Sequence, residues 1–185
     1  MNKKEKSYCQ LLFAFAIVFS IFIKTDFASA SPVTSEKIIE LTNYERGLRG
    51  LKPLKNNSQL FQAANIKSSN MIARNYFEHS AYGITPWVII KNAGYDYQVA
   101  GENLAMDFNT AEGVVSAWMK SPTHRYNVLN PDFEDIGVGV VKGDYSMSDS
   151  DSHSTFMVTQ MFGKKKPRVL AIASNVLTKI FGISF

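Results

Sequence analysis

The spacing of apolar residues divides the chain into a helical first part and a later part that contains strands. Apolar side chains recur every three or four residues over residues 36–48 and again over residues 59–76, which predicts two amphipathic helices. Ser58 stands where the second helix needs an N-cap. The positions expected to face the core are Ile38, Leu41, Tyr44 and Leu48 in the first helix and Leu60, Phe61, Ala64, Met71 and Ile72 in the second.

Shorter elements are predicted downstream. Thr85 and Pro86 have the N-cap and first-turn pattern of a short helix, which ends near Gly94. Residues 95–100 are predicted as turn and loop, and residues 110–119 as a helix. A further helical turn contains His124, and the large aromatic residues Trp87 and Trp118 are expected to fill the core.

Two apolar runs predict strands. They are "IGVGVV" at residues 136–141 and "FMVTQMF" at residues 156–162. Residues 142–154, rich in Ser, Asp and Gly, are predicted as an exposed hairpin loop. Helices followed by a strand pair indicate a layered α+β domain with an antiparallel sheet.

The first 30 residues have the pattern of a secretory signal peptide. Lysines precede a 13-residue run, residues 11–23, that is apolar except for one serine, and residues 28–30 ("ASA") form a small-residue cleavage pattern. The run is shorter than the roughly 20 apolar residues of a membrane-spanning helix. An uncleaved membrane anchor is the alternative interpretation. Cleavage after Ala30 would remove Cys9, the only cysteine.

The last 22 residues, 164–185, form a basic and then amphipathic tail. The basic cluster is Lys164, Lys165, Lys166 and Arg168, and the apolar positions at helical spacing are Val169, Ile172, Ala173, Val176, Leu177, Ile180 and Phe181. Such a segment is typical of a helix that lies on an anionic membrane or cell-wall surface. The alternatives are a terminal helix packed on the domain and a poorly ordered end.

Charge is unevenly distributed along the 185 residues. The formal net charge is +4, but residues 1–30 carry +2, residues 164–185 carry +5 and residues 31–163 carry −3. An acidic body argues against a nucleic-acid-binding domain, so no nucleic-acid partner is expected. A single cysteine excludes an intramolecular disulfide framework and zinc sites that need two or more cysteines.

Three polar residues, His79, Glu102 and His124, stand among apolar neighbours in the middle of the chain. Two imidazoles and a carboxylate are the ligands of open zinc sites, and the same groups exchange protons near neutral pH. The residues alone also allow each histidine to brace a loop and Glu102 to accept backbone hydrogen bonds. His153 is expected to be solvent-exposed, because it lies in the polar stretch "SDSDSHSTF". Asp149, Asp151 and His153 could bind a cation weakly, but the stretch lacks the central glycine and the terminal glutamate of a calcium loop.

Other catalytic motifs are absent from the sequence. There is no G-x-S-x-G nucleophile elbow and no glycine-rich phosphate loop. Five blocks instead occur in order: "LTNYERGLRGLKPLKNNSQLFQAA", "YFEHS", "AGYDYQVAGENLA", "VVSAWMKSPTHRYNVLNPDFEDIGVGVV" and "FMVTQMFG". Together they resemble the CAP superfamily of cysteine-rich secretory, antigen 5 and pathogenesis-related 1 proteins, also called SCP domains. The resemblance covers roughly residues 37–163 and is closest to the cysteine-free bacterial secreted branch.

The resemblance implies a three-layer α-β-α sandwich with a central antiparallel sheet, formed here by residues 31–163. It also implies an open cleft, which in several members holds a divalent metal. The F-x-H-S, G-E-N and S-P-x-H-R motifs correspond to His79, Glu102 and His124, so the resemblance predicts that these three side chains converge.

The chain departs from the family pattern at two places. The second acidic position of many eukaryotic members corresponds to Ser121, so a two-carboxylate mechanism is not expected. An Asp-Arg pair common in bacterial members corresponds to Val88 and Ile89, so a more apolar cleft rim is expected.

The function expected from this resemblance is a secreted, non-enzymatic binding module at the cell envelope or outside the cell. Its His79–Glu102–His124 cleft would hold a divalent cation such as zinc and receive a lipid, peptide or polysaccharide. One alternative is a metal-dependent hydrolase of peptide or cell-wall material with Glu102 as general base. The other is a lipid- or envelope-binding scaffold that docks through residues 164–185.

Overall fold

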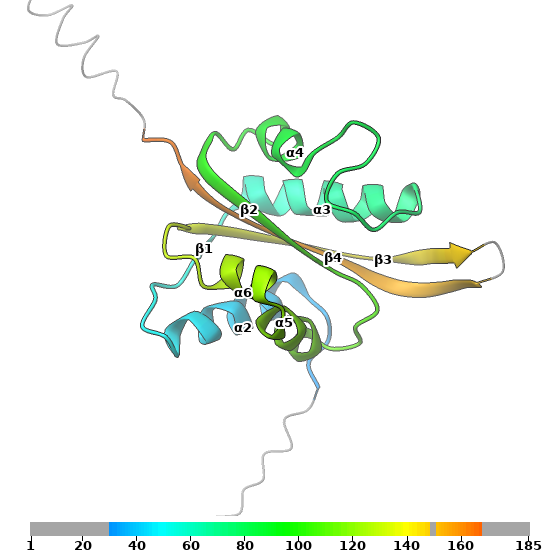
Figure 1. Ribbon diagram of the computed structural model, residues 1–185, viewed down its shortest axis with the longest axis horizontal. Helices are drawn as coiled ribbons and strands as arrows, with labels where there is room; N and C mark the ends of the chain where they lie inside the picture. The colour runs from blue at the N-terminus through cyan, green and yellow to red at the C-terminus, as the bar shows by residue number, and fades with distance from the viewer. Residues whose placement is uncertain (1–29, 149–150, 168–185) are drawn as a thin grey trace, which may run out of the picture. The chain divides into compact units, whose positions relative to one another are not determined.

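The computed structural model describes residues 30–148 and 151–167 (Figure 1). The predicted signal peptide, apart from Ala30, and the apolar part of the predicted tail therefore lie outside the described residues.

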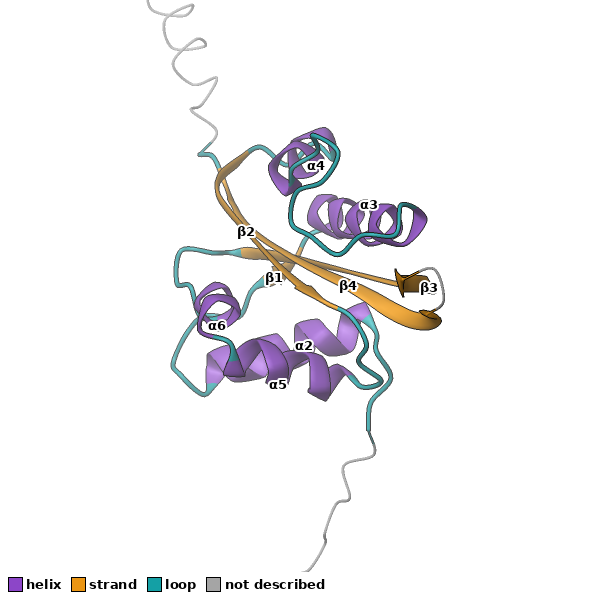
Figure 2. Ribbon diagram, turned by 45° about the vertical axis from the view of Figure 1, so that its right-hand side comes forward, coloured by secondary structure: helices purple, strands orange, loops and turns teal. Residues whose placement is uncertain are grey.

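The described part is built in three layers, with a sheet between two groups of helices (Figures 1 and 2). The strands are β1 (Lys55–Asn56), β2 (Tyr97–Ala105), β3 (Asp135–Ser148) and β4 (Asp151–Lys165). One face of the sheet is covered by α3 (Ser58–Ala73) and α4 (Pro86–Asn92). The other face is covered by α2 (Ser35–Gly47), α5 (Ala111–Lys120) and α6 (Pro122–Val128). The α-β-α sandwich is therefore confirmed.

The sheet has the strand order β1-β3-β4-β2 and is antiparallel along its three long strands. β1 adds a two-residue parallel pairing beside β3. β2 lies at the other edge and pairs with β4 only as far as Ala105↔Val158. Beyond that point β3 and β4 continue as a two-stranded ribbon, through pairs such as Gly143↔Thr155 and Tyr145↔His153.

Successive side chains of a strand point to opposite faces of the sheet, so each face packs into its own hydrophobic core with the helices that cover it. On β4, Val158 and Phe162 pack with the α2 and α5 layer, whereas Met157 and Met161 pack with the α3 and α4 layer. Gly137 and Gly139 on β3 face α3, and a Cβ atom at either position would overlap backbone atoms of that helix. The glycines of "IGVGVV" therefore allow α3 to lie directly against the sheet.

Several predictions of local structure are wrong for identifiable reasons. Residues 95–100 were expected to be loop, but β2 begins at Tyr97 because this segment pairs with β4. Most of residues 142–154 is strand, because the exposed side of the ribbon accepts polar residues that resemble a loop. The second helix is capped by the side chain of Asn57, not by Ser58. The side chains predicted as buried but found exposed are Tyr44, Leu48, Phe61 and Trp87.

The beginning of the basic tail is part of the sheet. Lys164 and Lys165 belong to β4, and Lys164 pairs with Glu134 at 2.8 Å. Lys166 pairs with Asp96 at 3.1 Å. No helix within residues 30–148 and 151–167 is long and apolar enough to cross a membrane.

Candidate functional site

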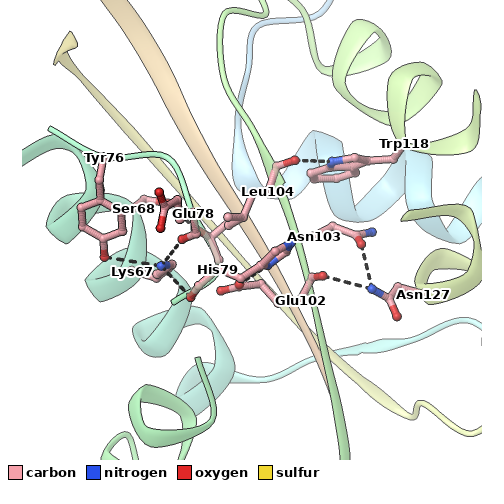
Figure 3. A network of polar contacts seen from close by, with 11 residues as sticks. Lys67, Ser68, Tyr76, Glu78, His79, Glu102, Asn103, Leu104, Trp118 and Asn127 are labelled. Carbon is pink, nitrogen blue, oxygen red and sulfur yellow. Dashed lines mark hydrogen bonds and ion pairs between the residues drawn. The ribbon is translucent and has the colours of Figure 1, made fainter. Parts of the chain in front are cut away.

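Edge strand β2 directs neighbouring polar side chains to opposite faces of the sheet. Glu102 points toward the α3 side, where it meets His79, and Asn103 points toward α6, where it meets Asn127 (Figure 3). The "GEN" motif thus contributes one side chain to each helical layer.

His79 and Glu102 form the centre of the site. The Nδ1 atom of His79 lies 2.7 Å from Oε1 of Glu102. The side chain of Glu102 is 1% exposed, whereas that of His79 is 57% exposed. The pair therefore places a solvent-facing imidazole on a buried carboxylate.

Each member of the pair changes the proton affinity of the other. The hydrogen bond with Glu102 raises the pKa of His79 above its ordinary value, although partial burial opposes this. Burial raises the pKa of Glu102, while the hydrogen bond from His79 and the charge of Lys67 oppose the rise. Oε2 of Glu102 is the one buried side-chain polar atom in the described ranges without a hydrogen-bond partner.

Lys67, on the inner face of α3, holds the segment that carries His79. Its ammonium group donates to the carbonyl oxygens of Glu78 at 2.6 Å and His79 at 2.9 Å, and it lies 4.8 Å from the ring centroid of Tyr76 (Figure 3). Lys67 is 1% exposed, and burial lowers its pKa, although the charge of Glu102 opposes this. Sequence analysis did not identify Lys67, which occupies an ordinary polar position of an amphipathic helix.

His124 comes from α6, in the opposite helical layer. Asn103 donates to its backbone carbonyl at 3.1 Å, and Asn127 of the same helix donates to the carbonyl of Glu102 at 3.0 Å. Burial lowers the pKa of the His124 imidazole, and the charge of His79 lowers it further. The charge of His79 therefore acts on His124, while only His79 is bonded to Glu102.

A chain of buried amides fixes the position of α6. Asn103 bonds Asn127 at 2.9 Å and Gln160 at 3.0 Å, and Gln160 donates to Thr42 of α2 at 2.9 Å. These contacts join α6 and α2 to strands β2 and β4. Asn103 and Gln160 were not identified from the sequence, although an Asn beside a motif glutamate is a usable signal.

The described residues contain no group of three His, Cys, Asp or Glu side chains arranged to hold a metal ion. Glu102 belongs to edge strand β2 and His124 to α6, and of the two histidines only His79 is hydrogen-bonded to the carboxylate. Metal binding by His79, Glu102 and His124 stays a prediction. Ser121 bonds Thr123 at 3.3 Å and supplies no carboxylate.

His153 lies on β4 and not in a loop. Its Nε2 atom is 2.7 Å from Oδ1 of Asp107, in the connection between β2 and α5. The predicted loop position is therefore wrong, because His153 belongs to a strand of the ribbon, but its side chain is still 36% exposed.

Comparison with known proteins identifies bacterial relatives. The pattern of the cysteine-rich secretory protein family, CAP, matches residues 39–162. The uncharacterized protein YkwD of Bacillus subtilis is 44% identical over 125 residues, which are 64% of this chain and 48% of YkwD. The uncharacterized membrane protein YlbC of the same species is 35% identical over 118 residues, 62% of this chain and 34% of YlbC. The match thus spans about half or less of these relatives.

Solved structures show the same fold. An extracellular SCP-domain protein from Bacillus anthracis has a TM-score of 0.60 at 28% identity, over 71% of this chain and 40% of that chain. The match to an outer surface protein from Borrelia burgdorferi also has a TM-score of 0.60, at 22% identity. It covers 75% of this chain and 100% of that chain.

Proposed function

Because the chain belongs to the cysteine-rich secretory protein (CAP) family, we propose that it is a binding module that acts outside the cytoplasm and presents His79 to its ligand. The secretory pattern of residues 1–30 supports this location. The description of the B. anthracis neighbour as extracellular supports it too.

The contrast in exposure between His79 and Glu102 carries the proposal. A ligand reaches the imidazole, because most of that side chain is in solvent, whereas the carboxylate is almost fully buried beneath it. Glu102 therefore acts through His79 by fixing its orientation and tautomer. Since Nδ1 bonds Glu102, Nε2 is the ring atom left for a lipid, peptide or polysaccharide ligand.

The residues also fit weak binding of a divalent cation such as zinc. A carboxylate that is hydrogen-bonded to Nδ1 of a histidine orients the other ring nitrogen, Nε2, toward a metal ion. His79 Nε2 and His124 would be the two imidazole ligands, and Glu102 has one carboxylate oxygen without a partner. The buried ammonium of Lys67 nearby disfavours further positive charge, so we expect weak affinity.

Zinc titration followed by calorimetry tests the cation site. We expect the double variant His79→Ala/His124→Ala to lose binding. His153→Ala is the matched control, since His153 also bonds a carboxylate at 2.7 Å but lies elsewhere. Equal zinc affinity of the double variant and the original protein would eliminate the cation site and leave the binding role of His79 to ligand screening.

A metal-dependent hydrolase with Glu102 as general base is the second proposal. Burial raises the pKa of Glu102 toward the range in which a carboxylate accepts protons efficiently, which favours this role. Peptide, peptidoglycan and ester substrates should be compared for the original protein and Glu102→Gln. Hydrolysis that disappears in Glu102→Gln supports an enzyme, and rates independent of Glu102 rule out this mechanism.

Docking to an anionic envelope through residues 164–185 is the third proposal. Lys164 and Lys166 already pair with acidic residues of the domain, so Arg168 and the residues after it are the part to remove. Deletion of residues 168–185 keeps β4 intact. Loss of co-sedimentation with anionic liposomes upon this deletion supports docking, and unchanged co-sedimentation contradicts it.

A further inference from the structure

A second polar pocket, independent of the proposed function, lies where the β2–α5 connection meets the ribbon of β3 and β4. It encloses about 340 Å³. Its main lining residues are Asp107, Phe108, Asn109, Lys142, His153 and Phe156. We call it the ribbon pocket. This volume is at the lower end of the range for small-molecule sites, which suits one small ring with its substituents.

Hydrogen bonds between the β2–α5 connection and β4 hold the walls of the ribbon pocket in place. Asp107 bonds His153 at 2.7 Å, and its backbone N–H donates to the hydroxyl of Thr155 at 2.9 Å. These contacts hold Asp107 in a left-handed conformation with a φ of 65°. Partial burial alone would raise the pKa of Asp107, but the hydrogen bonds from His153 and Thr155 lower it, so the carboxylate stays ionised.

Other polar groups in the pocket are available to a ligand. Within the described residues, the side chains of Asn109 and Ser154 have no hydrogen-bond partner. Lys142 has no carboxylate partner there, and its ammonium lies 5.7 Å from the ring centroid of Phe156. The ring of Phe108 adds a second, partly buried apolar wall.

From this set we infer that the ribbon pocket binds one acidic sugar unit of a polysaccharide. Sugar hydroxyls both donate and accept hydrogen bonds, as do the amide of Asn109 and the hydroxyl of Ser154, and the carboxylate of Asp107 accepts. The two phenyl rings match the apolar C–H face of a sugar ring. The carboxylate of an acidic sugar pairs with Lys142. A neutral sugar leaves that ammonium unpaired, and a simple anion leaves the hydroxyl partners unused.

Titration of the ¹⁵N-labelled protein with glucuronate, glucose and acetate, followed by NMR, tests the proposal. We expect glucuronate to shift the amide signals of residues 107–109 and 153–156 with a dissociation constant in the millimolar range, about 1 mM. Glucose and acetate should bind at least about fivefold more weakly. Glucose lacks the carboxylate that pairs with Lys142, and acetate lacks the hydroxyls and the ring of the sugar.

Two variants assign the contacts. Lys142→Met should weaken glucuronate binding about fivefold, as expected for loss of a partly exposed charge pair. Asn109→Ala should weaken both sugars and leave acetate unchanged. Lys91→Met is the matched control, because Lys91 lies over the Tyr97 ring at the same 5.7 Å but far from the pocket in sequence, and it should have no effect.

Three results would overturn the inference. They are acetate affinity equal to that of glucuronate, shifts that map outside the pocket, and a Lys142→Met variant that binds glucuronate as tightly as Lys91→Met does. None of these results depends on whether His79 binds a ligand, so the two proposals fail separately.

Discussion

The imidazole of His79 and the carboxylate of Glu102 lie 2.7 Å apart, and one is mostly in solvent while the other is almost fully buried. The pKa of the exposed imidazole therefore depends on the buried carboxylate. A substitution of Glu102 should change the pKa of His79 even when no ligand is present.

Replacing Glu102 with Gln should lower the pKa of His79. The hydrogen bond with the carboxylate is the main cause of the raised value, and the burial that remains acts in the opposite direction. NMR titration of the His79 ring protons measures the change. Asp107→Asn removes the carboxylate of the other histidine pair and should leave His79 as it was; an unshifted His79 in Glu102→Gln would contradict the assigned pairing.

The pair should make the protein less stable as the pH rises. Both pKa values are higher in the folded protein, so the folded state binds more protons than the unfolded state. The contribution is complete below the ordinary value of Glu102, 4.5, and is lost as the pH rises through the raised pKa values of Glu102 and His79. Denaturant unfolding from pH 4.5 to 8 should show this decline relative to the double variant His79→Gln/Glu102→Gln. A difference that stays constant with pH would refute it.

Lys67→Met should loosen the segment that carries His79. Met keeps the volume of the side chain but donates no hydrogen bonds to the carbonyls of Glu78 and His79. We expect a loss of about 1–3 kcal/mol in the free energy of unfolding, together with faster amide exchange at residues 77–80. Lys91→Met, at an exposed position of α4, is the control; equal stability and exchange in the two variants would show that Lys67 does not hold the segment.

Gly137→Ala should destabilise the protein by about 3 kcal/mol or more, because the added methyl group meets the backbone of α3 and not a flexible side chain. Gly47→Ala is the matched control, since nothing lies within 4 Å of its added Cβ. This control should be neutral or slightly stabilising, by about 0.5 kcal/mol. Thermal or denaturant unfolding compares them, and a Gly137→Ala protein as stable as Gly47→Ala would show that α3 can move away.

Local signals in the sequence predicted the helices well. Thr85 followed by Pro86 does cap α4, and Thr110 caps α5. Strand β2 was missed because its register depends on partners more than 50 residues away, as for Tyr97 and Lys165. The outer parts of β3 and β4 were missed because their polar residues resemble a loop. Phe61 was placed inside by its spacing in the helix and Trp87 by its size, although both side chains are exposed.

The candidate site was only partly predictable. Motif resemblance correctly brought His79 and Glu102 together, and His124 lies near enough for the charge of His79 to lower its pKa. It gave no sign of Lys67, because the partners of its ammonium are backbone carbonyls of a loop, which carry no side-chain signature.

The polar ribbon of β3 and β4 has a consequence for how the molecule behaves in a crowded solution. Past Ala105↔Val158, no third described strand accompanies the two, so backbone groups along their edges lack a strand partner and attract strands of other molecules. Those of Ser146 are an exception, because the side chain of Asn75 bonds them. Lysine, aspartate and serine side chains along this ribbon discourage such pairing, among them Lys142, Asp144, Ser146 and Ser152. The composition that resembles a loop therefore protects the protein against edge-to-edge aggregation.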